Sequence, residues 1–466
     1  GGRVNELPIT WLKTTLGQVV QYGQSQKVEP HAIPGDAWVL DLEDIERDTS
    51  RLFRRSIASE VEPRSTKNAF KAGDVLYGKL RPYLNKVVLA DQPGFCTTEV
   101  VPLDAKGLLD QRYLFHWLKS PEFIDHVVSE SHGMNMPRLG TAAGRAAPLV
   151  MPPLSEQQRI ADKLDAILAR VDACRYRIAN VLPTISAFRR AVLFAASSGR
   201  LTEDWRVVHP TGDAQGELDA WLGKRAAKER KLPIDADLRH WRANIPTGWV
   251  LASVNQFAEC LDRFRIPIKR EKRKSSAGLY PYYGANGEVG RIDEFIFDDD
   301  LVLVTEDETF YGREKPIAYR SSGKCWVNNH AHVLRAEDVE SNDYLCFALM
   351  HYDVQPWLTG TTGRAKLTQQ ALNSLPIPVP PKAEMREIVA RAKHLLRLAD
   401  RIEERVRAAL STSAKLGSAA LAKAFRGELV PQDPSDEPAQ AMLDRLKAQD
   451  PPEPAPRRRA GRATTA

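Results

Sequence analysis

A stripe of apolar residues, spaced alternately four and three positions apart, runs through residues 155–198. This is the spacing of the a and d positions of a coiled coil, and over about five heptads it predicts one long helix that packs against another. Ser155 and Gln158 form a capping-box signature after Pro152, and Gly199 stands where a left-handed residue ends a helix. The predicted seam consists of Ile160, Leu164, Ile167, Val171, Cys174, Ile178, Val181, Ile185, Phe188, Val192 and Ala195.

A second stretch with the same spacing follows Pro380-Pro381 and ends at Gly427. At about 1.5 Å per residue each helix is roughly 55–65 Å long, and we expect the two to pack as an antiparallel coiled coil. The alternative is that each helix packs only on its own domain. Pro183 leaves the phase of the first stripe unchanged, which favours a kink over a break. The second seam, rich in small residues, consists of Ile388, Ala392, Leu395, Ala399, Ile402, Val406, Ala409, Ser413, Leu416, Ala420 and Lys423.

The chain is duplicated internally. The sequence PPLSE at Pro152 matches PPKAE at Pro380, an offset of 228 residues, and at the same offset Gly199 meets Gly427 without a gap. The segments that precede these matches resemble each other more loosely. A module of this length repeated once predicts an approximate two-fold axis within one chain.

The segments before the two helices mix β-branched and aromatic runs with turns and short helical stretches. They predict two similar mixed α/β (α+β) domains separated by the long helices. The predicted organisation is a first domain at 3–150, a central helix at 151–201, a linker at 202–244, a second domain at 245–379, a C-terminal helix at 380–430 and a partly disordered tail at 431–466.

Charge and cysteine content narrow the function only slightly. The net charge of +6 and a pI near 8.9 permit a polyanionic partner without requiring one. The five cysteines are scattered and form no CxxC pair, which predicts a reducing compartment with no disulfide framework and no zinc site. No apolar run reaches the roughly 18 residues that span a bilayer, and no secretory signal is evident, so we expect a cytoplasmic protein without a membrane partner.

The chain lacks the common catalytic signatures. It contains no Walker P-loop, Rossmann glycine fingerprint, HExxH or GxSxG motif, and no methyltransferase motif. His330 and His332 would lie on one face of a strand, but no third ligand is evident, so we expect interior or base-contacting roles rather than a metal site. The alternative is a duplicated DNA-modifying enzyme with an unrecognised active site.

Four features together resemble the specificity subunit of type I restriction-modification enzymes, over nearly the whole chain. They are GDVLYGKLRPYLNKVVLA from Gly73, YYGANGEVGRIDEFIFDDDLVLV with VNNHAHVL in the other half, PPLSEQQRIADKLDAILARVD with its copy from Pro380, and the helix exits SSGRLTEDW and FRGELVPQD. The second copy departs from the family pattern. It has KAEMREI where the family typically has a segment that resembles LSEQQRI, so the capping serine is replaced.

The resemblance implies a non-catalytic subunit that binds double-stranded DNA. Two target-recognition domains would each read one half of a bipartite site, and the helices would fix the unread spacer. Two methyltransferase subunits and the restriction (motor-nuclease) subunits would assemble on this scaffold. No cofactor is expected in this chain, since S-adenosylmethionine, ATP and Mg²⁺ would belong to those partners.

Arginine and lysine suit phosphates or guanine, and asparagine suits adenine. In the first domain the predicted DNA-binding residues are Lys79, Arg81, Tyr83, Asn85, Lys86 and Arg138. In the second domain they are Arg263, Arg265, Lys269, Arg270, Lys272, Arg273, Lys274, Asn286, Arg313, Asn328, Asn329, Arg364 and Lys366. Tyr83 and the alternate strand positions are equally compatible with DNA contact and with a place in the core. The charge run at 263–274 is equally compatible with phosphate contact and with a solvated surface.

Overall fold

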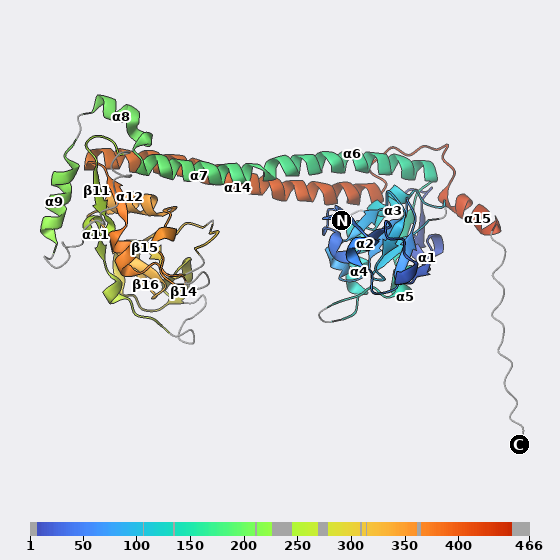
Figure 1. Ribbon diagram of the computed structural model, residues 1–466. Helices are drawn as coiled ribbons and strands as arrows, with labels where there is room; N and C mark the ends of the chain where they lie inside the picture. The colour runs from blue at the N-terminus through green and yellow to red at the C-terminus, as the bar shows by residue number, and fades with distance from the viewer. Residues whose placement is uncertain are drawn as a thin grey trace, which may run out of the picture. The chain divides into compact units, whose positions relative to one another are not determined.

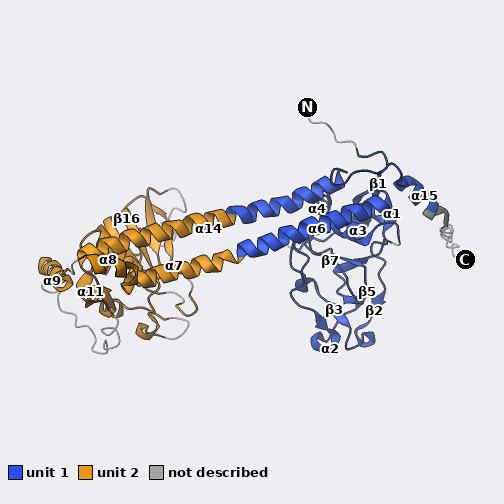
Figure 2. Ribbon diagram, turned by 90° about the horizontal axis from the view of Figure 1, so that it is seen from above, with its two compact units in different colours: residues 1–179, 408–466 blue, residues 180–407 orange. Residues whose placement is uncertain are grey.

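The structure, a computed structural model, describes residues 7–105, 107–133, 136–209, 212–225, 245–268, 278–307, 310–313, 315–360 and 365–449. The chain divides into two compact units (Figure 2). Unit 1 comprises residues 1–179 and 408–466, and unit 2 comprises residues 180–407. Each unit therefore combines one sheet-rich domain with parts of long helices (Figure 1).

The domain of unit 1 contains several small sheets, and its buried apolar residues form two separate hydrophobic cores. A five-stranded sheet has the order β2-β5-β8-β3-β4, a three-stranded sheet has the order β7-β6-β9, and β1 pairs antiparallel with β10. The strands are β1 (Leu12–Thr15), β2 (Lys27–Val28), β3 (Trp38–Leu40), β4 (Ser56–Ile57), β5 (Lys67–Phe70), β6 (Val75–Gly78), β7 (Val87–Leu89), β8 (Gly94–Cys96), β9 (Val100–Leu103) and β10 (Pro148–Met151). The helices are α1 (Leu16–Val19), η1 (Pro30–Ala32), η2 (Leu42–Asp44), α2 (Ala58–Val61), η3 (Pro82–Leu84), α3 (Gln111–Trp117), α4 (Pro121–Ser129) and α5 (Thr141–Ala146).

The domain of unit 2 centres on one six-stranded sheet of order β12-β17-β15-β16-β13-β14, beside the antiparallel pair β11-β18. The strands are β11 (Val250–Ser253), β12 (Glu259–Cys260), β13 (Tyr280–Gly284), β14 (Gly287–Ile292), β15 (Phe297–Thr305), β16 (Ala318–Val327), β17 (Ala331–Arg335) and β18 (Pro376–Val379). The helices are α11 (Val254–Phe257), η6 (Asp262–Phe264), α12 (Val339–Leu349), η8 (Gln355–Trp357) and α13 (Gln369–Ser374).

The duplication is confirmed by contacts that recur in both units. The Tyr113 hydroxyl on α3 donates to the carbonyl of Val150 at 2.7 Å, and the Tyr344 hydroxyl on α12 donates to the carbonyl of Pro378. In both cases the acceptor lies in the strand that leads into a long helix. Equivalent side chains therefore fix the short helix to the same strand in each copy.

A second recurring contact joins the start of each domain to the start of a long helix. The Trp11 indole donates to Glu156 Oε2 at 2.9 Å in unit 1, and the Trp249 indole donates to Glu384 Oε2 at 2.8 Å in unit 2. Both carboxylates are buried. Since burying an unpaired carboxylate is costly, these indoles are needed to keep the helix starts folded.

The long helices are α6 (Leu154–Ala179), α7 (Val181–Ser197) and α14 (Lys382–Phe425). In unit 1 the start of α6 packs with the end of α14, where Ile160 and Leu164 share one core with Leu421 and Phe425. In unit 2 the end of α7 packs in the same way with the start of α14. Within each unit the two helical segments are thus antiparallel, as the sequence predicted.

Near Pro183 the first long helix is interrupted at a single residue, Asn180, and continues as a helix on both sides. The proline has no N–H to donate to the carbonyl of Ala179, and α6 ends at that residue. Asn180, with φ −68° and ψ −10°, keeps helical backbone geometry between α6 and α7. The ladder of helical hydrogen bonds is therefore interrupted between α6 and α7.

Most of the predicted seam positions are buried or half-buried, but Cys174, Val181, Phe188, Ile402, Leu416 and Lys423 are exposed, so the prediction is wrong at these six positions. Phe188, Ile402 and Leu416 are 38%, 39% and 55% exposed. Their neighbours face the partner helix instead: Arg189 forms ion pairs with Asp400 and Glu403, and Gly417 lies against Leu168. An arginine that crosses the interface to carboxylates occupies the place expected for apolar residues. Buried or half-buried predicted positions are Ile160, Leu164, Ile167, Val171, Ile178, Ile185, Val192, Ile388, Leu395 and Val406.

The segments predicted as linker and tail contain ordered helices. The linker region includes η4 (Arg200–Thr202), α8 (Glu203–Val208) and α9 (Ala214–Lys224), and the tail includes α15 (Ala439–Gln449). Glu217 of α9 accepts a hydrogen bond from the backbone N–H of Lys382, the first residue of α14. Asp436, just before α15, accepts from Ser155 and forms an ion pair with Arg159 near the start of α6. In both units a carboxylate therefore satisfies groups at the start of a long helix.

Among the described residues, one helical stretch, 154–197, is long and apolar enough by composition to cross a membrane. That stretch is α6 with α7, whose apolar stripe packs on α14 within each unit. Its composition is therefore that of a coiled-coil helix.

Candidate nucleic-acid interface

In unit 1 an irregular turn projects from the sheet between β6 and β7. Arg81 and Asn85 both have left-handed backbones, with φ of 49° and 48°, on either side of η3. The turn is fastened at its base, because the N–H of Lys79 donates to the carbonyl of Glu99 and the N–H of Arg81 donates to that of Pro137. Left-handed arginine is uncommon, and such strained positions concentrate at functional sites.

The turn sorts the predicted residues into two groups. Arg81 and Tyr83 are exposed, and the Lys79 side chain is half-buried. The Lys86 ammonium instead donates to the carbonyl of Leu42 at 2.8 Å, and burial lowers its pKa. Asn85 is buried. DNA contact by Lys86 and Asn85 is therefore not favoured, while Lys79 is half-buried, and Arg81 and Tyr83 are exposed.

A hairpin with strands at His132 and Arg138 lies beside this turn. Arg138 forms isolated bridges with both His132 and Leu80, so this side of the hairpin is attached to the turn at Arg138. The Arg138 guanidinium lies 3.1 Å from Glu99 and remains mostly exposed. An exposed guanidinium with a rigid backbone is suited to a DNA phosphate, which would compete with Glu99 for it.

Sequence reasoning missed a third segment of this surface, the loop 46–53. Its two arms are joined by a bridge between Ile45 and Leu52, and the N–H of Asp48 donates to the carbonyl of Leu84 in the turn. The loop presents the exposed Arg47 and Phe53, the latter 69% exposed. The run RDTSRLFRR could have indicated this part of the surface, since four arginines around one aromatic residue are unusual in an ordinary surface loop.

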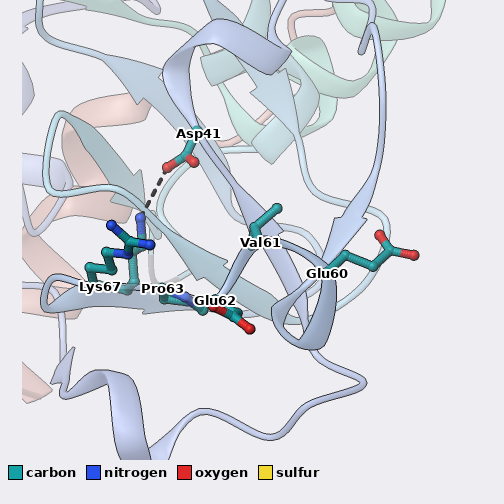
Figure 3. Close-up of a pocket in the computed structure, with 7 residues that line it drawn as sticks. Asp41, Glu60, Val61, Glu62, Pro63 and Lys67 are labelled. Atoms are coloured by element: carbon teal, nitrogen blue, oxygen red, sulfur yellow. Dashed lines mark hydrogen bonds and ion pairs between the residues drawn. The ribbon is translucent and has the colours of Figure 1, made fainter.

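A polar recess of about 260 Å³ lies at another edge of the same domain (Figure 3). Lys67 points across it to Asp41, with 3.0 Å between the ammonium and the carboxylate. Glu60 and Glu62 add two further carboxylates, and Arg64 one cation. The acidic groups outnumber the cations, so this recess does not suit a phosphate.

Unit 2 has an equivalent surface where β15 ends. The N–H of Leu367 donates to the carbonyl of Glu306, just as the N–H of Leu139 donates to that of Lys79 in unit 1. Lys366 then corresponds to Arg138, and it bridges to Thr359 in a similar hairpin. Its ammonium lies 3.4 Å from Asp307 and remains exposed.

Below this surface lies a buried polar network around His332. Asp262 accepts from the His332 Nδ1 side at 2.5 Å, and Arg265 contacts both Asp262 at 3.0 Å and Glu306 at 2.6 Å. Burial alone would raise the pKa of Asp262, but the hydrogen bond with His332, helped by Arg265, holds it below its ordinary value. A DNA contact by Arg265 is not favoured.

The same network is the one group of potential metal ligands found in the described part of the chain. Asp262, Glu306 and His332 bring ligand atoms within 4.8 Å of one another. Both His332 nitrogens are engaged, the second with the carbonyl of Leu367 at 2.7 Å, and Arg265 supplies the positive charge. The chemistry of the site is therefore that of a structural ion network and does not fit a divalent cation.

The remaining predicted residues of unit 2 differ in accessibility. Arg313 donates to Asn286 Oδ1 at 2.7 Å in a partly exposed pair. Asn329 is exposed, whereas Asn328 is buried and accepts from the N–H of His330, so a base contact by Asn328 is not favoured. Arg263 is exposed and lies 3.3 Å from Glu259. Lys269, Arg270, Lys272, Arg273, Lys274 and Arg364 lie outside the described residues.

The sequence matches the profile of the type I restriction modification DNA specificity domain over residues 8–183 and again over 246–412. It is 25% identical over 471 residues to the EcoDI specificity subunit of Escherichia coli, covering 95% of this chain and 96% of that protein. It is 27% identical over 360 residues to the EcoKI specificity subunit of E. coli K12, covering 74% of this chain and 73% of that protein.

Solved structures share the fold. A chain from a structural study of complex assembly and conformational transition of the type I R-M system has a TM-score of 0.65 at 21% identity and covers 91% of this chain and 100% of that one. The HsdS subunit of Thermoanaerobacter tengcongensis has a TM-score of 0.51 at 19% identity, covering 92% and 99%.

Proposed function

The chain belongs to the family of type I restriction-modification DNA specificity subunits, and we propose that each of its two domains reads one half of a bipartite site in double-stranded DNA. One observation carries this proposal. The two domains share a backbone framework but place different chemistry on it: the position held by Lys79 in unit 1 is held by Glu306 in unit 2. Duplicated readers with different side chains at matched positions suit two different half-sites.

In unit 1 the proposed contacts come from three segments. Arg81 and Tyr83 project from the strained turn, Arg138 from the hairpin, and Arg47 and Phe53 from the loop. In unit 2 they come from Arg313, Asn329 and Lys366. Arginine suits guanine edges or phosphates and asparagine suits adenine, and rigid backbone attachment of these groups lowers the entropy cost of reading them.

We further propose that the helices set the spacer between half-sites and carry the partner subunits. A helix transmits distance at about 1.5 Å per residue, which a flexible linker would not do. The helices also leave Tyr176, Phe188, Ile402 and Leu416 exposed, and exposed apolar residues on a long helix suit a docking partner. Two methyltransferase subunits and the restriction subunits would dock in the cytoplasm and bring S-adenosylmethionine, ATP and Mg²⁺.

The proposal is tested by mapping methylated adenines in the DNA of a host that expresses the matching methyltransferase subunit. With this chain present we expect methylation at one bipartite motif, and without it none. An exchange of residues 79–86 and 132–138 for those of a relative should alter one half of the motif only. Changes in both halves, or in neither, would contradict the one-domain, one-half-site assignment.

The alternative, a DNA-modifying enzyme, is tested with the pure chain. Incubation with S-adenosylmethionine and mixed-sequence DNA should transfer no methyl groups, and Mg²⁺ should produce no cleavage. Methyl transfer by this chain alone would overturn the non-catalytic assignment.

A further inference from the structure

Unit 2 contains a groove of about 850 Å³ between the C-terminal half of α7 and the segment from the end of α12 to η8. Aromatic side chains line much of it, namely Phe194, Phe347, Tyr352 and Trp357. Phe194 is 59% exposed, although it lies on a helix whose opposite side is buried. A concave surface of this size with aromatic walls can bury a large apolar side chain of a partner.

Two large residues of unit 1 are replaced by small ones at the matching positions of unit 2. In unit 1 Phe425 stands two residues before the left-handed Gly427, and its ring meets the ring of Trp117 edge-on at 4.9 Å. Both rings are buried. In unit 1 this place is therefore filled by two aromatic side chains of the protein itself.

In unit 2 the matching positions hold small residues. Ser197 stands two residues before the left-handed Gly199. Ala348 follows Tyr344 by four residues on α12, as Trp117 follows Tyr113 on α3, and both tyrosines make the same carbonyl contact. Ser197 and Ala348 both line the groove. The space that unit 1 fills from within is thus open to another molecule in unit 2.

The rim of the groove is basic. Arg190, Arg200 and His351 line it, and Asp353 is the one carboxylate among its lining residues. Both arginines are exposed, and the Arg200 guanidinium lies 5.5 Å from the centre of the Phe194 ring. The Ser198 hydroxyl, also in the wall, is buried without a hydrogen-bond partner in the described structure. Acidic groups around an apolar anchor would complement this rim and use that hydroxyl.

We propose that the groove receives an acidic segment of the partner methyltransferase subunit, which inserts an aromatic or large aliphatic side chain where unit 1 keeps Phe425. This inference rests on the proposed function and adds that the two units hold the partner by unequal surfaces. Unit 2 offers an anchoring groove, and unit 1 offers a closed surface at the matching position.

The duplication supplies the test variant, Ser197→Phe combined with Ala348→Trp. These are the residues that unit 1 packs in the same place, so the full-length chain should keep its melting temperature. We expect the methyltransferase subunit, titrated into the chain and counted by native mass spectrometry, to bind at unit 2 at least tenfold more weakly. The complex with a single methyltransferase subunit should then dominate where wild type carries two.

A second variant, Arg190→Glu with Arg200→Glu, leaves the groove open and reverses its rim, and it should weaken the same binding step. Lys315→Glu with Lys324→Glu is the matched control, because it reverses two exposed cations of unit 2 outside the groove. Wild-type binding that both test variants retain would overturn the groove assignment alone. A wild-type chain that binds no methyltransferase subunit at all would overturn the proposed function with it.

Discussion

The two matched buried glutamates allow one substitution to be compared in two environments. Glu384 accepts from the indole of Trp249 at 2.8 Å and from the hydroxyl of Thr202 at 2.7 Å, and it forms an ion pair with Arg206. Glu156 accepts from the indole of Trp11 through one oxygen, while its Oε1 is buried without a partner in the described structure. Burial raises the pKa of Glu156.

Glutamine should therefore have opposite effects at the two sites. Glu384→Gln leaves Arg206 partly buried without its counter-charge, and breaking such a pair costs about 3–5 kcal/mol, reduced to about 2–4 because Arg206 retains a hydrogen bond to the carbonyl of Gly199. Glu156→Gln removes a desolvated charge that has one hydrogen bond, and it should change stability by less than about 1 kcal/mol or increase it. The two costs should differ by at least ~1 kcal/mol.

The pH dependence of the free energy of unfolding is an independent test of the role of Glu156. Because its folded pKa is raised above the unfolded value, the native state binds the proton more tightly, so this group's contribution is complete below the unfolded pKa and is lost as pH rises through the folded pKa. This pH-dependent contribution to stability is measured by urea unfolding of wild type and of Glu156→Gln at pH 5 and pH 7. Hydrogen exchange within unit 1 serves as the probe of unfolding. Equal costs for the two glutamine variants at pH 7 would refute the assignment of Glu156 as the less satisfied carboxylate.

Three further outcomes are expected. Arg81→Ala with Tyr83→Ala should weaken binding to the cognate site by about 1–3 kcal/mol per lost base contact and leave the melting temperature unchanged. Lys86→Ala should instead lower the melting temperature. Fluorescence anisotropy measures the DNA binding, and calorimetry measures the melting temperature. Reversing several cations within 263–274 should weaken binding to all sequences and flatten its salt dependence, and an unchanged salt slope in the assembled complex would exclude phosphate contact there. Pro183→Ala should join α6 to α7 and slow amide exchange at residues 180–184, so unchanged exchange would show that the proline does not cause the interruption.

The sequence predicted the architecture well because its signals were periodic and repeated. The heptad stripe and the PPLSE/PPKAE match are each spread over many residues, so single exceptions did not obscure them. The sequence did not predict which of two neighbouring residues on a helix faces the partner helix. Phe188 and Arg189 are neighbours, and only the carboxylates of Asp400 and Glu403 across the interface show that the arginine faces inward.

The candidate site was predictable by region more than by residue. The motif GKLRPYLNK falls on the turn between β6 and β7, where Lys86 donates to the carbonyl of Leu42 and Arg81 is exposed, so its role in DNA binding stays a prediction. That difference depends on left-handed backbones at Arg81 and Asn85, which residue type does not predict. The loop at Arg47 and Phe53 was missed because it lies far along the chain from the turn it contacts.

The core of unit 1 joins Trp117 and Leu164 to Phe425 and Leu443, residues that are synthesised far apart in time. At about 5–20 residues per second, the ribosome needs on the order of ten seconds or more after α6 to deliver the end of α14. During that interval the apolar side of the nascent α6 is exposed. Chaperones should therefore bind this protein most often before residues 408–449 emerge from the ribosome. A premature stop codon there would leave the first domain permanently short of the residues that complete it.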